Sequence, residues 1–147
     1  MLEAERYMRE ALLEAQKDEN EVPVGAVIVL EGRIIARAHN EREGGGPFAH
    51  AEMLAMSRAC EALETRRLHG CTMYVTLEPC PMCAGGMIMA ELERCVFGAY
   101  DRNQGCCVSV YSLPEDACFY HRTQVLGGVL EQECAALLTD FFQKKRG

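Results

Sequence analysis

The sequence predicts an α/β fold, a three-layer α/β/α sandwich in which helices cover both faces of a mixed five-stranded sheet. Two observations support this prediction. Two apolar runs joined by a two-residue turn are typical of an antiparallel hairpin, and helical and strand patterns alternate after them. Alternation of this kind pairs strands in parallel, so both strand directions should occur in one sheet. We expect residues 1–147 to form a single domain.

The first quarter of the chain should form a helix and then the hairpin. Apolar side chains recur at helical spacing from residue 2 to about residue 18, which predicts an amphipathic helix. The hairpin strands are the apolar runs at 24–30 and 33–38, and Glu31-Gly32 is the turn between them.

The remaining elements alternate between helix and strand. The loop at 40–47 is rich in glycine, the long loop contains Pro114, and the strands are short apolar runs. In chain order we expect a loop at 40–47, a helix to about residue 64, a strand at 72–77, a helix at 80–90, a strand at 95–99, a long loop, a strand at 124–126 and a helix at 131–144.

Two short clusters carry the chemistry, His50-Ala51-Glu52 and Pro79-Cys80-Pro81-Met82-Cys83. They spell H-x-E followed by P-C-x-x-C, which supplies one imidazole and two thiolates for a tetrahedral zinc. Three protein ligands leave one coordination position open, and an open position distinguishes a reactive zinc from a structural one. We therefore predict one Zn²⁺ per chain, bound by His50, Cys80 and Cys83.

Neither cluster by itself is specific for a catalytic metal. Most H-x-E pairs are solvated helix starts, and C-x-x-C also occurs in zinc fingers and thioredoxin-like redox sites. A structural zinc would need a fourth ligand at comparable spacing, but His39, His69 and His121 form no matching pair with a cysteine. The two clusters together, each at an expected helix start, favour a catalytic metal.

Glu52 is expected to carry protons and not to bind the metal. Zinc with three protein ligands lowers the pKa of a bound water to about 7, so a nucleophile exists at neutral pH. Glu52 would take a proton from this water and deliver it to a substrate nitrogen and then to the departing amine. The expected substrate has an amidine-like carbon with an exocyclic amine, and the products are a carbonyl and ammonia.

Four segments resemble a known family in one register. They are PVGAV at 23–27, FAHAE at 48–52, YVTLEPCPMCAG at 74–85, and ECAALL at 133–138 followed by Phe141-Phe142. These segments resemble the bacterial tRNA-specific adenosine deaminase family, within the cytidine/deoxycytidylate deaminase superfamily. The resemblance implies a cytidine deaminase-like fold, conversion of adenosine to inosine at the wobble position of a tRNA anticodon, and a homodimer.

The resemblance also implies residues that bind the substrate. Asn40 matches the family's asparagine that hydrogen-bonds the purine, although asparagine is also common in turns. Val24 and Ala51 would line the flipped base. Phe142, or its neighbour Phe141, would stack on a base of the anticodon stem-loop, although an aromatic residue on such a helix more often belongs to the core.

The chain departs from the family's usual residues mainly in one loop. Asn103 stands where a lysine is usual, Gln104 replaces a threonine, and Cys106-Cys107-Val108 replaces alanine, alanine and glycine. Outside this loop, Phe48 replaces a threonine and Tyr120 an asparagine. These positions lie on surfaces that contact RNA in the family, so they bear on substrate recognition and leave the deamination chemistry intact.

The net charge of −7 is not typical of a nonspecific nucleic-acid binder, because phosphate neutralisation dominates such affinity. Basic residues gather at 144–146 and at 66–67, which are either RNA contacts or solvated helix ends. Two alternative functions therefore stay open. One is a deaminase of a free base or nucleoside of the guanine or cytosine type, and the other is a non-catalytic, zinc-stabilised RNA-binding protein.

Hydropathy and cysteine content point to a cytoplasmic protein with no membrane partner. No apolar run approaches membrane-spanning length, and the N-terminus lacks the pattern of a signal peptide. Nine cysteines are an odd number, and a reducing compartment disfavours disulfides. Four of the seven remaining cysteines should act as small apolar side chains: Cys60, Cys71, Cys95 and Cys134. The other three lie in the long loop and have no assigned role: Cys106, Cys107 and Cys118.

Overall fold

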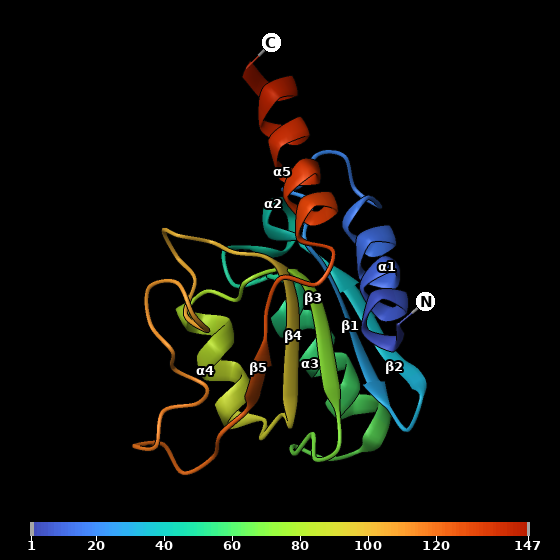
Figure 1. The fold of residues 1–147 in the computed structure, drawn as a ribbon. Coiled ribbons are helices and arrows are strands. Elements are labelled where there is room, and N and C mark those ends of the chain that lie inside the picture. The colour runs from blue at the N-terminus through green and yellow to red at the C-terminus, as the bar shows by residue number, and fades with distance from the viewer. Residues whose placement is uncertain (1, 147) are drawn as a thin grey trace.

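The computed structural model describes residues 2–146 (Figure 1). Its elements follow the predicted order, with one additional short helix. In chain order they are α1 (Glu3–Ala15), β1 (Gly25–Leu30), β2 (Arg33–His39), α2 (Arg42–Gly45), α3 (Ala51–Leu63), β3 (Thr72–Leu77), α4 (Pro81–Met89), β4 (Arg94–Ala99), β5 (Gln124–Leu126) and α5 (Glu131–Arg146).

The five strands form one mixed sheet, as predicted, and the structure gives their order as β2-β1-β3-β4-β5. The strand β1 pairs antiparallel with β2 and β3, and β4 pairs parallel with β3 and β5. The hairpin turn has positive φ at both central residues, Glu31 (50°) and Gly32 (78°). This conformation matches the twist of the flanking strands, so the turn closes the hairpin without splaying it.

Helices cover both faces of the sheet (Figure 1). Side chains of α1 and α5 pack with one face, and those of α3 and α4 pack with the other. Successive residues of β1 alternate between the two layers: Ala26 and Ile28 face α3, whereas Val27 and Val29 face α1. All four are buried, so the strand has the continuous apolar run typical of a sheet covered on both sides. The predicted three-layer sandwich is therefore confirmed.

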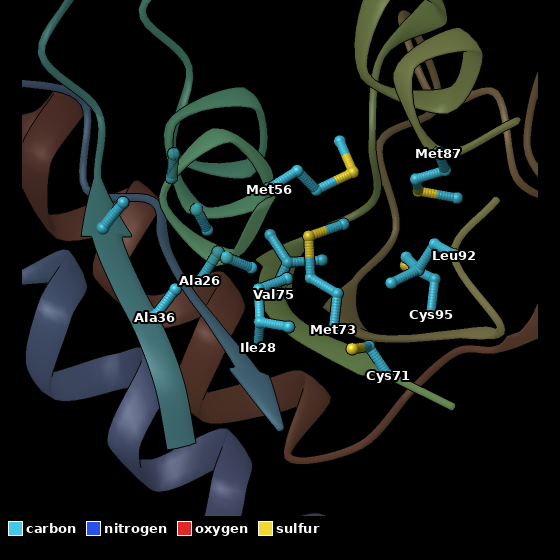
Figure 2. Packing of buried hydrophobic residues seen from close by; sticks show 14 of the residues in the cluster. Ala26, Ile28, Ala36, Met56, Cys71, Met73, Val75, Met87, Leu92 and Cys95 are labelled. Carbon is cyan, nitrogen blue, oxygen red and sulfur yellow. The ribbon is translucent and has the colours of Figure 1, made fainter. Parts of the chain in front are cut away.

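The larger core lies beneath α3 and α4 (Figure 2). There Met73 and Val75 of β3 meet Met56 of α3 and Met87 of α4, and all four are buried. This packing fixes the two helices relative to β3, whose C-terminal end leads into α4. None of the helices within residues 2–146 is both long enough and apolar enough to cross a membrane.

The expectation of a loop throughout residues 40–47 was wrong. Arg42–Gly45 forms the short helix α2, and its backbone N–H at Glu43 donates to the carboxylate of Glu21 at 2.6 Å. Glu21 is itself buried, so a contact between segments 22 residues apart stabilises a turn that a glycine-rich sequence does not favour. The helix α1, which precedes the hairpin, ends at Ala15, three residues earlier than predicted.

Candidate active site

Two helix N-termini place the ligand residues. His50 is the N-cap of α3 and Cys80 is the N-cap of α4, and both have extended backbone conformations that allow a helix to begin at the next residue. Pro81 occupies the first turn of α4, where its fixed φ suits a helix start and its missing N–H is no loss. The N-terminal ends of helices favour negative charge, so this arrangement suits the thiolates of Cys80 and Cys83.

The distances between the ligand atoms fit a zinc ion. His50 Nδ1 lies 3.6 Å from Sγ of Cys80 and 3.6 Å from Sγ of Cys83, and the three ligand atoms lie within 4.8 Å of one another. A tetrahedral zinc with ordinary Zn–N and Zn–S bond lengths separates nitrogen from sulfur by about 3.6 Å. Across residues 2–146, this is the one group of three such side chains that converges on a point.

The pKa values of the two thiols move in opposite directions. A hydrogen bond with Cys83 lowers the pKa of Cys80 to about 5, although burial opposes the shift, and the same bond together with burial raises the pKa of Cys83. One thiolate is therefore already favoured at neutral pH. Zinc binds cysteine as thiolate, so a bound zinc ion would displace the proton that Cys83 otherwise keeps.

Glu52 lies in the first turn of α3, two residues after His50, but it is not part of the ligand group. It is the second residue of α3 and is 4% exposed. Burial raises the pKa of Glu52 to about 7, and the charge of Cys80 also raises it. A carboxyl group with a pKa near the working pH both accepts and donates a proton readily, which suits a proton carrier.

A cavity of about 330 Å³ opens beside the cluster. Its volume falls at the lower end of the range for small-ligand sites and suits a group the size of a nucleobase. The residues that line it flank the β1–β2 hairpin or lie at the end of β3, at the N-terminal ends of α2, α3 and α4, and in the loop after β4: Val22, Val24, Asn40, Arg42, His50, Glu52, Leu77, Glu78, Cys80, Asp101 and Gln104.

Asn40 lines this cavity and also fixes the start of α3. Its Oδ1 accepts a hydrogen bond from the N–H of Ala51 at 2.9 Å, and its Nδ2 donates to the carbonyl of Val22 at 3.3 Å. Val24 also lines the cavity. Ala51, in contrast, is fully buried and is not among the lining residues, so its backbone orients Asn40.

Phe142 lies outside the cavity but borders it. It is on α5 and 47% exposed, and it lines two neighbouring hollows of about 960 Å³ and about 440 Å³. Val22 and Arg42 line all three cavities, so the three adjoin one another. Phe141 lines the larger hollow, where the amine of Lys145 lies 5.5 Å from its ring centre.

Sequence reasoning missed several of the lining residues. Asp101 and Gln104 follow the end of β4, and the C-terminal ends of parallel strands are where ligands usually bind, so a usable signal was present. Glu78 lies two residues before Cys80, the first cysteine ligand, and the sequence predicted no role for its carboxylate. Arg42 carries no such signal, because it lies in a segment expected to be a loop.

The nine cysteines are all free thiols. The group expected to act as small apolar side chains is largely inside the protein: Cys71, Cys95 and Cys134 are buried, and Cys60 is half-buried. Two cysteines of the long loop, Cys106 and Cys107, are also buried, whereas Cys118 is exposed.

The chain is similar to characterised zinc deaminases. Residues 1–99 match the sequence profile of the cytidine and deoxycytidylate deaminase zinc-binding region. The tRNA-specific adenosine deaminase of Bacillus subtilis (strain 168) is 51% identical over 99% of this chain and 92% of its own, and that of Aquifex aeolicus (strain VF5) is 44% identical over 97% and 95%.

A solved structure agrees with these relatives. It comes from studies of A-to-I editing by tRNA:A34 deaminases at the wobble position of transfer RNA, with a TM-score of 0.86 and 42% identity over 90% of this chain and 99% of its own. The fold, the zinc cofactor of the profile and the convergent His50, Cys80 and Cys83 all agree with the family predicted from the sequence. This chain therefore belongs to the tRNA-specific adenosine deaminase family of zinc-dependent deaminases.

Proposed function

We propose that this protein deaminates adenosine to inosine at the wobble position of a tRNA anticodon. The observation that carries the proposal is the buried Glu52 beside the His50, Cys80 and Cys83 group, at the wall of a cavity of about 330 Å³. The relatives named tRNA-specific adenosine deaminase support the choice of an adenosine in RNA among the possible amine-bearing bases.

His50, Cys80 and Cys83 would hold the zinc, which activates water for attack when it is bound. Glu52 would carry one proton of the attacking water to a purine ring nitrogen and then the second, from the hydroxyl formed at the attacked carbon, to the departing amine, so that ammonia leaves and a carbonyl remains. Asn40 would help to orient the purine from the wall of the cavity, where the N–H of Ala51 already fixes its side chain.

The surroundings of the cavity suit an RNA strand. Arg42 is exposed at its rim, and Arg102 is exposed in the adjoining hollow of about 440 Å³. The half-exposed ring of Phe142 lies in the same hollow. Guanidinium groups bind phosphates, and an exposed aromatic ring stacks on an unpaired base, so we propose that nucleotides beside the edited one bind here.

The substrate is tested with a synthetic anticodon stem-loop that has adenosine at the wobble position. We expect the zinc-loaded enzyme to form inosine there, and to leave unchanged a matched RNA whose only loop adenosine is moved to the middle anticodon position. Free guanine, cytosine and cytidine are the comparison substrates. Ammonia release from a free base or nucleoside, without inosine in the RNA, would assign the enzyme to the alternative class.

We further propose that the protein is a homodimer that uses the groove between α3 and α4. This groove measures about 790 Å³, and the side chain of Met89 at its edge is 76% exposed. Exposed apolar surface of this kind marks protein contacts, and a second copy can bury the same surface on both partners. Its apolar lining residues are Met53, Met56, Cys60, Gly86, Met89 and Ala90.

Sedimentation of two matched variants tests the dimer. The wild type should have about twice the chain mass of 16.4 kDa, and Met89→Lys should give the monomer mass because a charge would be buried at the contact. Leu13→Lys is the control, since Leu13 is 56% exposed on α1, away from the groove. A dimer that survives Met89→Lys would rule this surface out. A tRNA substrate would place the enzyme in the cytoplasm, and that location stays our expectation.

A further inference from the structure

Glu78 is the most extensively hydrogen-bonded carboxylate in the described chain, and it is 2% exposed. Its Oε2 accepts from the backbone N–H groups of Cys107 (3.2 Å), Val108 (2.7 Å) and Ser109 (2.8 Å). Its Oε1 accepts from the N–H of Asp101 (3.1 Å) and the hydroxyl of Ser109 (2.6 Å). One side chain at the end of β3 thus binds both ends of the 101–109 loop.

The loop is also tied to the neighbouring backbone. The N–H of Cys106 donates to the carbonyl of Pro79 at 2.8 Å, and the N–H of Gly105 donates to the carbonyl of Asp101 at 2.8 Å. Gly105 approaches so closely that a Cβ there would overlap the carboxylate of Glu78. The turn at residues 78–80, which leads into the cysteine ligands, is therefore bound directly to the 101–109 loop.

This loop forms part of the wall of the active-site cavity. Asp101 and Gln104 both line the cavity, and each lies within the segment that Glu78 binds. Four of the five donors to Glu78 are backbone N–H groups, which every residue except proline provides. The contacts therefore do not depend on the side chains of Cys106, Cys107 and Val108, where the sequence departs from the family's usual residues.

We propose that Glu78 is a positioning residue, whose carboxylate holds the 101–109 loop against the metal-binding turn so that Asp101 and Gln104 form a fixed wall for the bound nucleotide. This inference rests on the proposed function only for the identity of the bound nucleotide. Because the contacts are made to the backbone, the exposed side chains of the loop can change what is recognised while the wall keeps its place.

The proposal is tested with Glu78→Gln in the zinc-loaded protein. The amide keeps the size of the side chain but loses the charge and turns an NH₂ group toward N–H donors, so the loop should loosen. We expect faster hydrogen exchange at the amides of Val108 and Ser109, a KM for the stem-loop raised about tenfold or more, and kcat within about threefold of the wild type. Zinc content should stay at one per chain.

Glu14→Gln is the matched control. Glu14 is also a buried carboxylate, but it pairs with Lys17 and Arg37 on the far side of the sheet, so its replacement should cost stability and leave KM unchanged. Ser109→Ala removes only the hydroxyl donor. We expect it to raise KM and the amide exchange rates in the same direction as Glu78→Gln, but only about two- to fivefold. If Glu78→Gln does not fold, Ser109→Ala decides the question.

Two results would overturn the proposal. One is a loop whose amides exchange faster while KM stays at the wild-type value, because the loop would then be no wall. The other is an equal rise of KM in Glu14→Gln, because general destabilisation would then explain the effect. If the wild type forms no inosine in the RNA, the proposed substrate is wrong, and the exchange rates alone then show whether Glu78 holds the loop.

Discussion

Glu52 and Glu78 are both buried carboxyl groups beside the metal ligands, but their surroundings give them different chemistry. Burial raises the pKa of Glu52 to about 7, so it gains and loses a proton at neutral pH. Burial would also raise the pKa of Glu78, but hydrogen bonds from Ser109, Val108 and Asp101 outweigh it and hold the pKa below the ordinary value. Glu52 therefore suits proton transfer, and Glu78 suits permanent contacts as a charged acceptor.

Gly105 offers an independent residue-scale prediction about this contact. Gly105→Ala adds a Cβ that must displace the Glu78 carboxylate or the carbonyl of Asp101, so we expect a loss of about 1–3 kcal/mol in unfolding free energy. Urea denaturation measures this loss. Gly44→Ala is the control, because nothing lies within 4 Å of its added Cβ. Equal stability of the two variants would mean that the contact at Gly105 is loose.

At the scale of elements, a zinc ion held by His50, Cys80 and Cys83 would join the N-termini of α3 and α4. His50 comes from one helix, and Cys80 and Cys83 come from the other. Both helices also pack on the core beneath β3, so the metal would link elements that are already neighbours. The ion should therefore add stability to a fold whose core is formed by other contacts.

Zinc removal tests this link. Treatment with a chelator should lower the melting temperature by roughly 10 °C, because binding free energy of a few kcal/mol is lost. Calorimetry measures the change, and added zinc should restore the original value. Cys80→Ser should show the lower melting temperature with or without added zinc. An unchanged melting temperature in the chelated wild type would show that the metal does not join the two helices.

The sequence could predict elements whose cause is local, and it failed where the cause was distant. Apolar periodicity and the Glu31-Gly32 turn predicted the hairpin, and Pro81 marked the start of α4. The short helix α2 depends on the carboxylate of Glu21, which accepts a hydrogen bond from the N–H of Glu43, 22 residues later in the chain. No local sequence pattern could therefore predict this helix. The same holds for the site: spacing predicted the ligand group, but the contacts of Glu78 reach 31 residues along the chain.

At the scale of the whole molecule, an acidic protein must bind a polyanion through local basic surface. The net charge is −7, yet Lys144 and Lys145 lie exposed on the last turns of α5. Lys145 lines the hollow of about 960 Å³ that adjoins the active site, and both lysines line a further hollow of about 540 Å³ beside it. The side chain of Arg146, the third basic residue of this segment, lies outside the described residues. Lys145 is therefore the residue of this basic end that lies at a hollow adjoining the site, and Lys144 lies beside it in the chain.

Salt dependence measures the contribution of this basic end. The double variant Lys144→Ala and Lys145→Ala should reduce the slope of log affinity for the stem-loop against log salt by about 2, because two fewer phosphates are neutralised. Arg33→Ala is the control, since Arg33 follows the hairpin turn at the opposite end of β2 from Asn40. Equal slopes for wild type and double variant would show that α5 makes no phosphate contact.

Proton transfer by Glu52 is the central claim, and Glu52→Gln tests it most directly. The amide has nearly the same size but cannot carry a proton, so inosine formation in the stem-loop should fall by about 100-fold or more. Zinc content should stay at one per chain, because Glu52 is not in the ligand group. Inosine formation within about threefold of the wild type, with zinc bound, would contradict the account.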